Sequence, residues 1–433
     1  MLYRVVAILA LALLMSAGAA RAERPAPEEA LRTWYRLVLE LVRHTPTYSP
    51  PVASRAFAYL GVTGFEIAAS IDPSLTSLSG QLNGLGEMPD PDGEIDAGVA
   101  VNAALAHAVP ELFANTGPTG QRAMKAMGTK LSAGAADGLD PALVARSEAH
   151  GRAVAASVLA WSQTDGGAVV ENMGFPLDYA VAKEPGRWVP TNLIRQQQAP
   201  LLPRWGEVRT FAMPTGASCG LPPPPAYSED PASAFYAEAR EVYDAVRGLT
   251  PEQRAIARFW SDDPMLSPTP PGHWISIALD VLEEQKRGLA DTADVLARLG
   301  IALADGFIGC WHAKFQFDLI RPITYIKKHI DPAWEPLLNT PPFPEYPSGH
   351  STQSGAAAVV LTAFFGPGFA FEDRTHADDG LEPRHYAGFW EAAEEAGLSR
   401  LYGGIHFRAA IERGLDQGRC IGAHAAALKT REH

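Results

Sequence analysis

The stretch from Trp311 to His406 constrains most strongly what this chain can fold into, because it carries three separated clusters of cations and histidines. Residues 291–320 lack proline, and their apolar side chains recur every three or four positions, which predicts a buried amphipathic helix. Lys314 and Arg321 are two helical turns apart, so the pattern predicts that both leave one face of this helix and that Pro322 ends it. Taken alone, such a pair of cations usually lies on a solvated helix face. If the pair is buried, each cation needs an acceptor, and a bound oxyanion would be one.

The second cluster has the pattern of a helix N-terminus. Residues 341–347 are too rich in proline to be helical, Ser348 is a favourable N-cap, and residues 351–365 have a helical composition. The free N–H groups of a first turn attract anions, Gly349 lets the backbone approach closely, and His350 could exchange protons with a bound group. An ordinary capped helix has the same pattern.

The third cluster pairs Arg400 with His406. On an unbroken helix these residues would point in different directions, but Gly403-Gly404 predicts a break that lets both turn to one centre. A final helix is then expected from residue 407 to about 428. A plain helix–turn–helix corner is the alternative when this cluster is considered alone.

Together the clusters supply three fixed cations, a helix N-terminus and two histidines. Three cations suit a tetrahedral oxyanion better than a neutral ligand, and two histidines allow one to bond to the central atom while the other moves protons. The patterns K-x6-RP, PSGH and SR-x5-H, in this order, resemble the signature shared by vanadium-dependent haloperoxidases and type 2 phosphatidic acid phosphatases. The chain resembles the bacterial haloperoxidase-like branch of this superfamily.

The resemblance implies a role for each matching position. His406 would bond to vanadium or attack phosphorus, and His350 would be the acid–base histidine. The groups implied to hold the oxyanion are Lys314, Arg321, Ser348, Gly349, His350 and Arg400.

Trp311 and Phe343 match the bulky aromatic residues beside the vanadate of fungal chloroperoxidase-type enzymes, which favours the haloperoxidase side. The implied cofactor is vanadate, with hydrogen peroxide and a halide as substrates. The alternative is a soluble acid phosphatase that needs no cofactor and forms a phosphohistidine at His406 from a phosphoester. A catalytically silent oxyanion-binding relative is a third possibility.

One position departs from the superfamily pattern, which places an aspartate four residues after the third-motif histidine. Here that position is Ala410, while Glu412 points to another face of the helix and Asp416 is farther along. A carboxylate in this place orients the histidine and raises its basicity. Its absence predicts that His406 is a weaker ligand or nucleophile.

The rest of the chain predicts an all-α fold, a helical bundle of the haloperoxidase/acid phosphatase type. Residues 23–228 are predicted as an N-terminal helical region whose segment 164–228, rich in Pro, Gly and Trp, is irregular and packs across the bundle. Residues 229–433 are predicted as the bundle that carries the oxyanion site. Other helices are expected at 27–44, 51–71, 93–114, 119–133, 140–163, 229–247, 250–261 and 275–288, with one more ahead of Ser399.

Four further side chains are weaker candidates for the edge of the site. His273 falls in a predicted loop, Ser267 to Trp274, where a structural role is more usual. The other three, His376, Arg384 and His385, follow the second motif.

Residues 1–22 have the pattern of a secretory signal peptide, and no other stretch is long and apolar enough to span a bilayer. We therefore expect an exported protein, periplasmic or extracellular. The net charge of −13 argues against nucleic acid as a partner. The chain has three cysteines, Cys219, Cys310 and Cys420, which allow at most one disulfide and lack the spacing of metal ligands. We expect Cys310 to be a small core residue.

Overall fold

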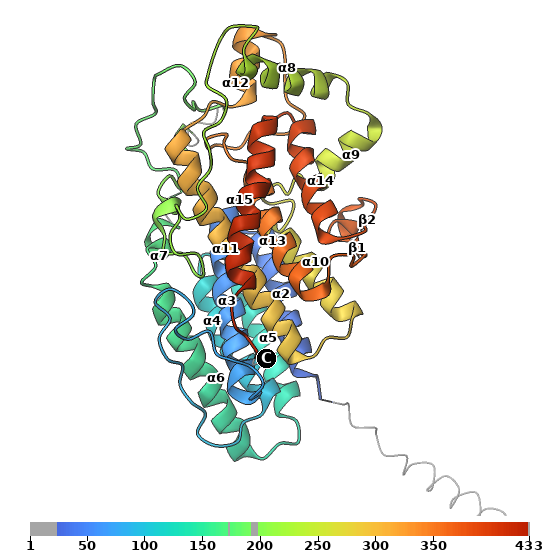
Figure 1. Ribbon diagram of the computed structural model, residues 1–433. Helices are drawn as coiled ribbons and strands as arrows, with labels where there is room; N and C mark the ends of the chain where they lie inside the picture. The colour runs from blue at the N-terminus through green and yellow to red at the C-terminus, as the bar shows by residue number, and fades with distance from the viewer. Residues whose placement is uncertain (1–23, 172–173, 192–197, 432–433) are drawn as a thin grey trace, which may run out of the picture.

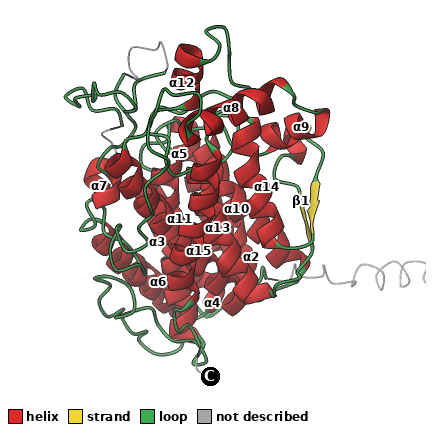
Figure 2. Cartoon of the chain, turned by 45° about the horizontal axis from the view of Figure 1, so that its top comes forward, coloured by secondary structure: helices red, strands yellow, loops and turns green. Residues whose placement is uncertain are grey.

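The computed structural model describes residues 24–171, 174–191 and 198–431, and within them the chain is almost entirely helical. The prediction of an all-α bundle is confirmed. Helices α11 (Leu289–Phe317), α13 (Gly349–Phe365) and α15 (Arg408–Ala426) lie at the centre of both views (Figures 1 and 2). The predicted signal peptide lies outside the described residues. Among the described helices none has the length and apolarity that crossing a membrane requires.

The first part of the chain forms helices close to the predicted ranges. Proline occupies the first helical position of four of them, where its missing N–H has no intrahelical partner to lose. Asp96 and Asp140 each cap one of the helices through their side chains. These helices are α2 (Pro27–Arg43), α3 (Pro50–Ile71), α4 (Ala97–Leu112), α5 (Pro118–Ala136), α6 (Pro141–Ser162) and the short α7 (Gly167–Val170).

The segment that follows α7 is irregular, as predicted, apart from the short 3-10 helix η2 (Trp205–Glu207). It is anchored to α11 by Asp305, whose buried carboxylate accepts hydrogen bonds from three successive backbone N–H groups, those of residues 211–213, at 2.6 to 2.9 Å. Trp188 and Trp205 are each 1% exposed, so this part packs into the bundle instead of forming a mobile linker.

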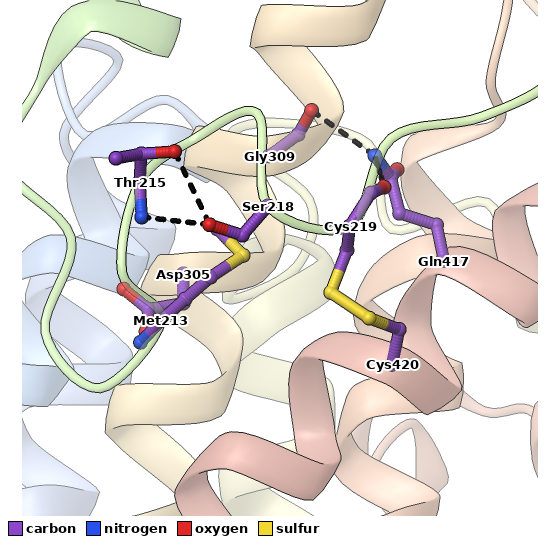
Figure 3. The surroundings of a disulfide bond; sticks show 8 residues. All are labelled: Met213, Thr215, Ser218, Cys219, Asp305, Gly309, Gln417 and Cys420. Carbon is purple, nitrogen blue, oxygen red and sulfur yellow. Dashed lines mark hydrogen bonds between the residues drawn. A yellow bond between two sulfur atoms is a disulfide. The ribbon is translucent and has the colours of Figure 1, made fainter.

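A disulfide between Cys219 and Cys420 ties the same segment to α15, and Cys310 is free and buried (Figure 3). Beside it, the Gln417 side-chain amide donates to the backbone oxygens of Cys219 and Gly309, each at 3.2 Å, and so joins the segment to both α15 and α11. The expectation of at most one disulfide is confirmed.

The second part of the chain adds further helices around this centre. The connection after α13 forms a two-stranded antiparallel hairpin with Phe371 opposite Tyr386, where the sequence predicted only a polar connection. The elements not yet named are α8 (Ala234–Arg247), α9 (Pro251–Phe259), α10 (Thr269–Glu284), α12 (Pro322–His329), β1 (Phe371–Asp373), η3 (Ala377–Asp379), β2 (Arg384–Tyr386) and α14 (Phe389–Tyr402).

Two predicted boundaries are wrong. Helix α11 ends at Phe317 because Asp318 adopts a left-handed conformation (φ 49°), so Lys314 and Arg321 do not share a helix. Pro322 begins α12 instead of ending α11, and Arg321 is its N-cap. Helix α10 likewise starts at Thr269, because prolines are tolerated in a first turn, and this places His273 in a helix instead of a loop.

The main hydrophobic core runs from Ala30 to Leu428 and so includes both parts of the chain. Helices α3 and α11 approach so closely that a Cβ added at Gly61 would lie 2.7 Å from Ala297 Cα. Helices α13 and α15 are closer still, because a Cβ at Gly418 would lie 2.2 Å from the backbone oxygen of Thr352. The division of the chain at residues 228/229 stays a prediction.

Candidate active site

The three sequence clusters meet where the C-terminal ends of α11 and α14 approach the N-terminal ends of α13 and α15. The proline-rich loop of residues 341–348 lies between them and is hydrogen-bonded to side chains from both sides. Helix ends bring free N–H groups, and loops bring carbonyl oxygens, so polar side chains can be buried here without losing all their partners.

Lys314 lies in the last turn of α11 and is fully buried. Its ammonium group donates to the backbone oxygens of Pro344 at 2.8 Å, Glu345 at 3.0 Å and Pro347 at 2.5 Å. These bonds use all three protons of the ammonium group. Lys314 therefore fastens the loop to α11, and a direct bond from Nζ to an oxyanion would replace one of the carbonyls.

Arg321 is equally buried and bridges the loop to the third cluster. Its Nε donates to Phe343 O at 2.9 Å, and its Nη1 donates to Ile405 O at 2.9 Å and lies 3.2 Å from His406 Nε2. Its Nη2 is buried without a hydrogen-bond partner among the described residues. A buried guanidinium with an unused donor is costly unless an acceptor occupies the space beside it.

Arg400 extends from the last turn of α14 and is 2% exposed. Its Nε donates to Ser399 Oγ at 2.9 Å, and its Nη2 donates to the backbone oxygen of Trp260. Its positive charge contributes to lowering the pKa values of His350 and His406, so Arg400 belongs to the same group. The predicted break between the last two helices is present, with Gly404 in the left-handed region (φ 77°).

The start of α13 supplies the predicted helix N-terminus. The Ser348 hydroxyl accepts a hydrogen bond from the Ser351 N–H at 3.3 Å, and Gly349 is the first helical residue. The His350 side chain keeps 15% of its surface exposed, whereas Ser348 is fully buried. Solvent therefore reaches this group of residues from the side of His350.

Trp311 and Phe343 lie together beside the cations, with ring centroids 4.9 Å apart. The Phe343 ring centroid is 5.1 Å from both Lys314 Nζ and Arg321 Cζ. This distance permits cation–π attraction, which partly offsets the burial of the charges. The two aromatic residues thus form an apolar wall next to the polar cluster.

The charges of this cluster are poorly compensated. Burial lowers the pKa of Lys314 to about 7 and the pKa values of Arg321 and Arg400 to about 10. Burial, followed by the charges of Arg321 and Lys314, also lowers the pKa of His406 well below its usual value, so its imidazole is neutral near pH 7. A bound anion would remove most of this cost, so the arrangement suits an oxyanion.

Sequence reasoning missed Glu345. Its side chain is fully buried, and its Oε1 lies 2.8 Å from His406 Nδ1 and accepts a hydrogen bond from the Phe407 N–H at 2.8 Å. Burial raises the pKa of Glu345 to about 8, although the charges of Arg321 and Lys314 oppose the increase. A carboxyl group therefore contacts His406 despite Ala410. The available signal was one acidic residue in an otherwise apolar loop beside PSGH.

A second missed feature is a buried network of aspartates and histidines behind His350. Its Nε2 lies 3.5 Å from Asp262 Oδ2, and the other Asp262 oxygen lies 2.8 Å from His273 Nδ1 and 3.3 Å from His376 Nε2. Asp373 Oδ2 is 2.8 Å from His273 Nε2. The two aspartates come from a loop and a hairpin that are far apart in the sequence, so no sequence spacing could have indicated this network.

Within this buried network, His273 and His350 differ in charge. Burial opposes protonation of His273, but the charges of Asp262 and Asp373 outweigh it and raise its pKa to about 10. Burial would raise the pKa of Asp262, yet the charge of His273 lowers it well below its usual range. Burial and the charge of Arg400 lower the pKa of His350 to about 4, so this ring can accept a proton near pH 7.

The structure brings together every residue that the sequence placed in the oxyanion site or its aromatic wall. Of the weaker candidates, His273 and His376 reach Asp262, whereas Arg384 pairs with Glu395 and the exposed His385 lies near Glu372. As expected, Glu412 and Asp416 point elsewhere and pair with arginines of their own helix, Arg408, Arg413 and Arg419.

This geometry has counterparts among known proteins. Residues 294–432 match a family model described as the VCPO second helical-bundle domain. Over 255 residues the chain is 26% identical to the vanadium chloroperoxidase of Curvularia inaequalis. The match covers 43% of this chain and only 42% of the length of that relative.

Solved structures extend the likeness over nearly the whole chain. A bacterial vanadium-dependent iodoperoxidase superposes with a TM-score of 0.85 and 39% identity, covering 94% of this chain and 97% of that one. A holo-type bacterial vanadium-dependent chloroperoxidase shares the fold, with a TM-score of 0.69 and 18% identity over 89% of this chain and 94% of that one. At the identity and coverage of the first structure, the chain belongs to the vanadium-dependent haloperoxidase family.

Proposed function

We propose that this chain oxidises a halide with hydrogen peroxide, using vanadate held at His406. The observation that carries the proposal is the burial of three cations near a neutral histidine, one of whose ring nitrogens lies against Arg321. The likeness to an iodoperoxidase over almost the whole chain supports the same conclusion.

The residues present fit a tetrahedral oxyanion. Arg321 Nη2 is a buried donor without a hydrogen-bond partner in the described part of the chain, and it would gain an acceptor from a bound oxyanion. His406 Nε2 would bind the central atom, while Arg321, Arg400 and the N–H groups that follow Ser348 would hold the oxygens. When bound, vanadate supplies a Lewis acid that activates hydrogen peroxide.

The side chains supply proton transfer, charge and shielding. His350, neutral near pH 7, would accept a proton from hydrogen peroxide and would return it to the peroxide oxygen that leaves as water. The three cations would stabilise the negative charge that develops as the peroxide O–O bond breaks. In the complete reaction, the halide, hydrogen peroxide and one proton from solvent would give hypohalous acid and water. Trp311 and Phe343 shield this step from bulk water.

The test is turnover by purified protein with hydrogen peroxide and iodide, bromide or chloride, with and without added vanadate. We expect activity only with vanadate, loss of activity in His406→Ala, and full activity in His385→Ala, whose exposed imidazole lies outside the site. Vanadate-loaded protein that oxidises none of the three halides would refute the proposal.

A phosphomonoesterase remains the second candidate, because an unprotonated His406 Nε2 beside buried cations also suits attack on phosphorus. Steady release of phosphate from p-nitrophenyl phosphate by vanadate-free protein, abolished by His406→Ala, would favour it. Oxyanion binding without either activity would instead indicate a silent relative.

We also propose that the protein is exported, to the periplasm or beyond the cell. The disulfide between Cys219 and Cys420 supports this, because such bonds persist mainly in oxidising compartments. Fractionation of expressing cells, with N-terminal sequencing of the mature chain, tests the proposal. A reduced protein retained in the cytoplasm with its full N-terminus would contradict it.

A further inference from the structure

We infer that Glu345 is the positioning residue that sets the tautomer and orientation of His406, in place of the carboxylate that position 410 lacks. Glu345 comes from the proline-rich loop ahead of α13, whereas His406 comes from the turn ahead of α15. The inference deepens the proposed function, because it concerns the histidine that would bind the oxyanion.

The tautomer follows from the partners of the two ring nitrogens. Arg321 Nη1 lies 3.2 Å from His406 Nε2, and a guanidinium group can only donate. Nε2 must therefore accept, and the single proton of the neutral ring must reside on Nδ1. The atom that faces Nδ1, at 2.8 Å, is Glu345 Oε1, which takes this proton as its hydrogen-bond acceptor.

Glu345 is itself held at both ends, as a positioning residue must be. Its Oε1 also accepts from the Phe407 N–H at 2.8 Å, and Phe407 is the N-cap of α15. Its backbone N–H donates to Leu319 O at 3.0 Å, and its backbone oxygen accepts from Lys314 Nζ at 3.0 Å. The loop that carries the carboxyl group is thus fixed to Lys314, and the carboxyl group itself is fixed to the end of the helix that follows His406.

The same contacts explain why alanine is acceptable at position 410. The backbone oxygen of Ala410 accepts from the Ser348 N–H at 3.0 Å, and its methyl group lies in the smaller core with Phe407 and Ile411. One Nδ1–H can serve only one strong acceptor, so a carboxylate at position 410 would compete with Glu345 for His406.

Glu345 could instead act only as a cap for α15. Glu238 provides the matched control, because it also accepts a backbone N–H bond at the start of α15, from Ala409 at 3.3 Å, but no bond joins it to His406. A capping role predicts that changes at Glu345 and Glu238 reduce stability alike, without altering the His406 ring.

The experiment compares Glu345→Ala, Glu345→Gln and Glu238→Gln with the wild type in vanadate-free protein. Histidine labelled with 15N reports the tautomer of each ring by NMR, with the His406 signals assigned from a His406→Ala sample. Calorimetric titration with vanadate then measures oxyanion affinity, and urea unfolding identifies variants that do not fold.

We expect the wild type to show the Nδ1–H tautomer and Glu345→Ala to lose it, with vanadate affinity lowered about tenfold to a hundredfold, as for other groups that orient a metal-binding histidine. Glu345→Gln keeps an oxygen that can accept from Nδ1, so it should retain the tautomer and most of the affinity even if Glu345→Ala does not fold. Glu238→Gln should change neither reading.

A wild-type ring protonated on Nε2 would overturn the inference, as would a Glu345→Ala protein with an unchanged tautomer and affinity. Loss of the tautomer in Glu345→Gln as complete as in Glu345→Ala would also contradict it. The NMR reading needs neither vanadate nor a halide, so a failure of the proposed halide oxidation would leave this result intact and distinguishable.

Discussion

Substituting Gly418 by alanine should push apart the two helices on which the candidate site depends. Helix α13 begins with the residues of the second cluster, and α15 follows His406 directly, so their separation sets the distance between His350 and His406. A Cβ at Gly418 would lie 2.2 Å from Thr352 O and 2.8 Å from Ala356 N. Both are backbone atoms, which cannot rotate away as a flexible side chain could.

The size of the effect follows from two opposing contributions. Overpacking a tight core costs about 3 kcal/mol at the upper end of the usual range. Alanine in place of glycine inside a helix returns about 1 kcal/mol. The net result is a loss of about 2 kcal/mol in the free energy of unfolding. The helices must also move apart by about 1 Å to restore normal contact, which weakens their remaining packing.

The matched control is Gly128→Ala in the middle of α5, where the added methyl group would meet Ala106 at 3.5 Å and Trp34 at 3.6 Å, both ordinary contacts. This variant should be as stable as the wild type or up to about 1 kcal/mol more stable. Urea unfolding measures both values, and vanadate titration should show weaker binding only in Gly418→Ala. Equal stability and equal binding in the two variants would refute the argument.

Three further predictions concern the elements that hold the site. Replacing Cys219 by serine should lower the free energy of unfolding by up to about 5 kcal/mol, the chain-entropy limit for a loop of this length, since Cys219 and Cys420 are 201 residues apart; an unchanged thermal midpoint would contradict this. Burial lowers the pKa of His273, but its two flanking carboxylates outweigh burial and raise the pKa to about 10. The stabilisation that protonated His273 contributes is therefore complete below about pH 6.5 and is lost as the pH rises to 10. Unfolding measured from pH 6 to 10 should therefore show a steeper loss of stability in the wild type than in His273→Gln, and parallel curves would exclude the effect. Lys314→Met should cost at least about 2 kcal/mol, because three buried carbonyls lose their donor, whereas Lys130→Met on the exposed face of α5 should be neutral in the same urea assay.

The sequence was sufficient for the fold class and for the meeting of the three clusters. Apolar spacing and proline positions predicted most helices within a few residues, because a first-turn proline and a helical apolar face are local features. The disposition of Lys314 and Arg321 was wrong in detail, since the left-handed Asp318 divides them between a helix end and the next N-cap. Both still reach Phe343, so the prediction that they lie together did not depend on the helix.

The partners of the two histidines could not be predicted in the same way. Glu345 contacts His406 across 61 residues, and Asp373 reaches His273 across 100 residues. Such contacts depend on how the loop of residues 341–348 and the hairpin fold back on the bundle, which no local pattern encodes. Ala410 drew attention to a missing carboxylate, but only the folded chain shows which residue stands in its place.

The most direct test of one oxyanion site built from three distant segments is a titration of vanadate into unloaded protein and its variants. We expect one vanadate per chain, with affinity lowered about tenfold to a hundredfold by loss of a charged hydrogen-bond donor in Arg321→Met or Arg400→Met. His406→Ala should bind more weakly as well, and Arg419→Met, an exposed arginine of α15, should bind as the wild type does. Unchanged vanadate affinity in the Arg321, Arg400 and His406 variants would show that these segments do not share one anion.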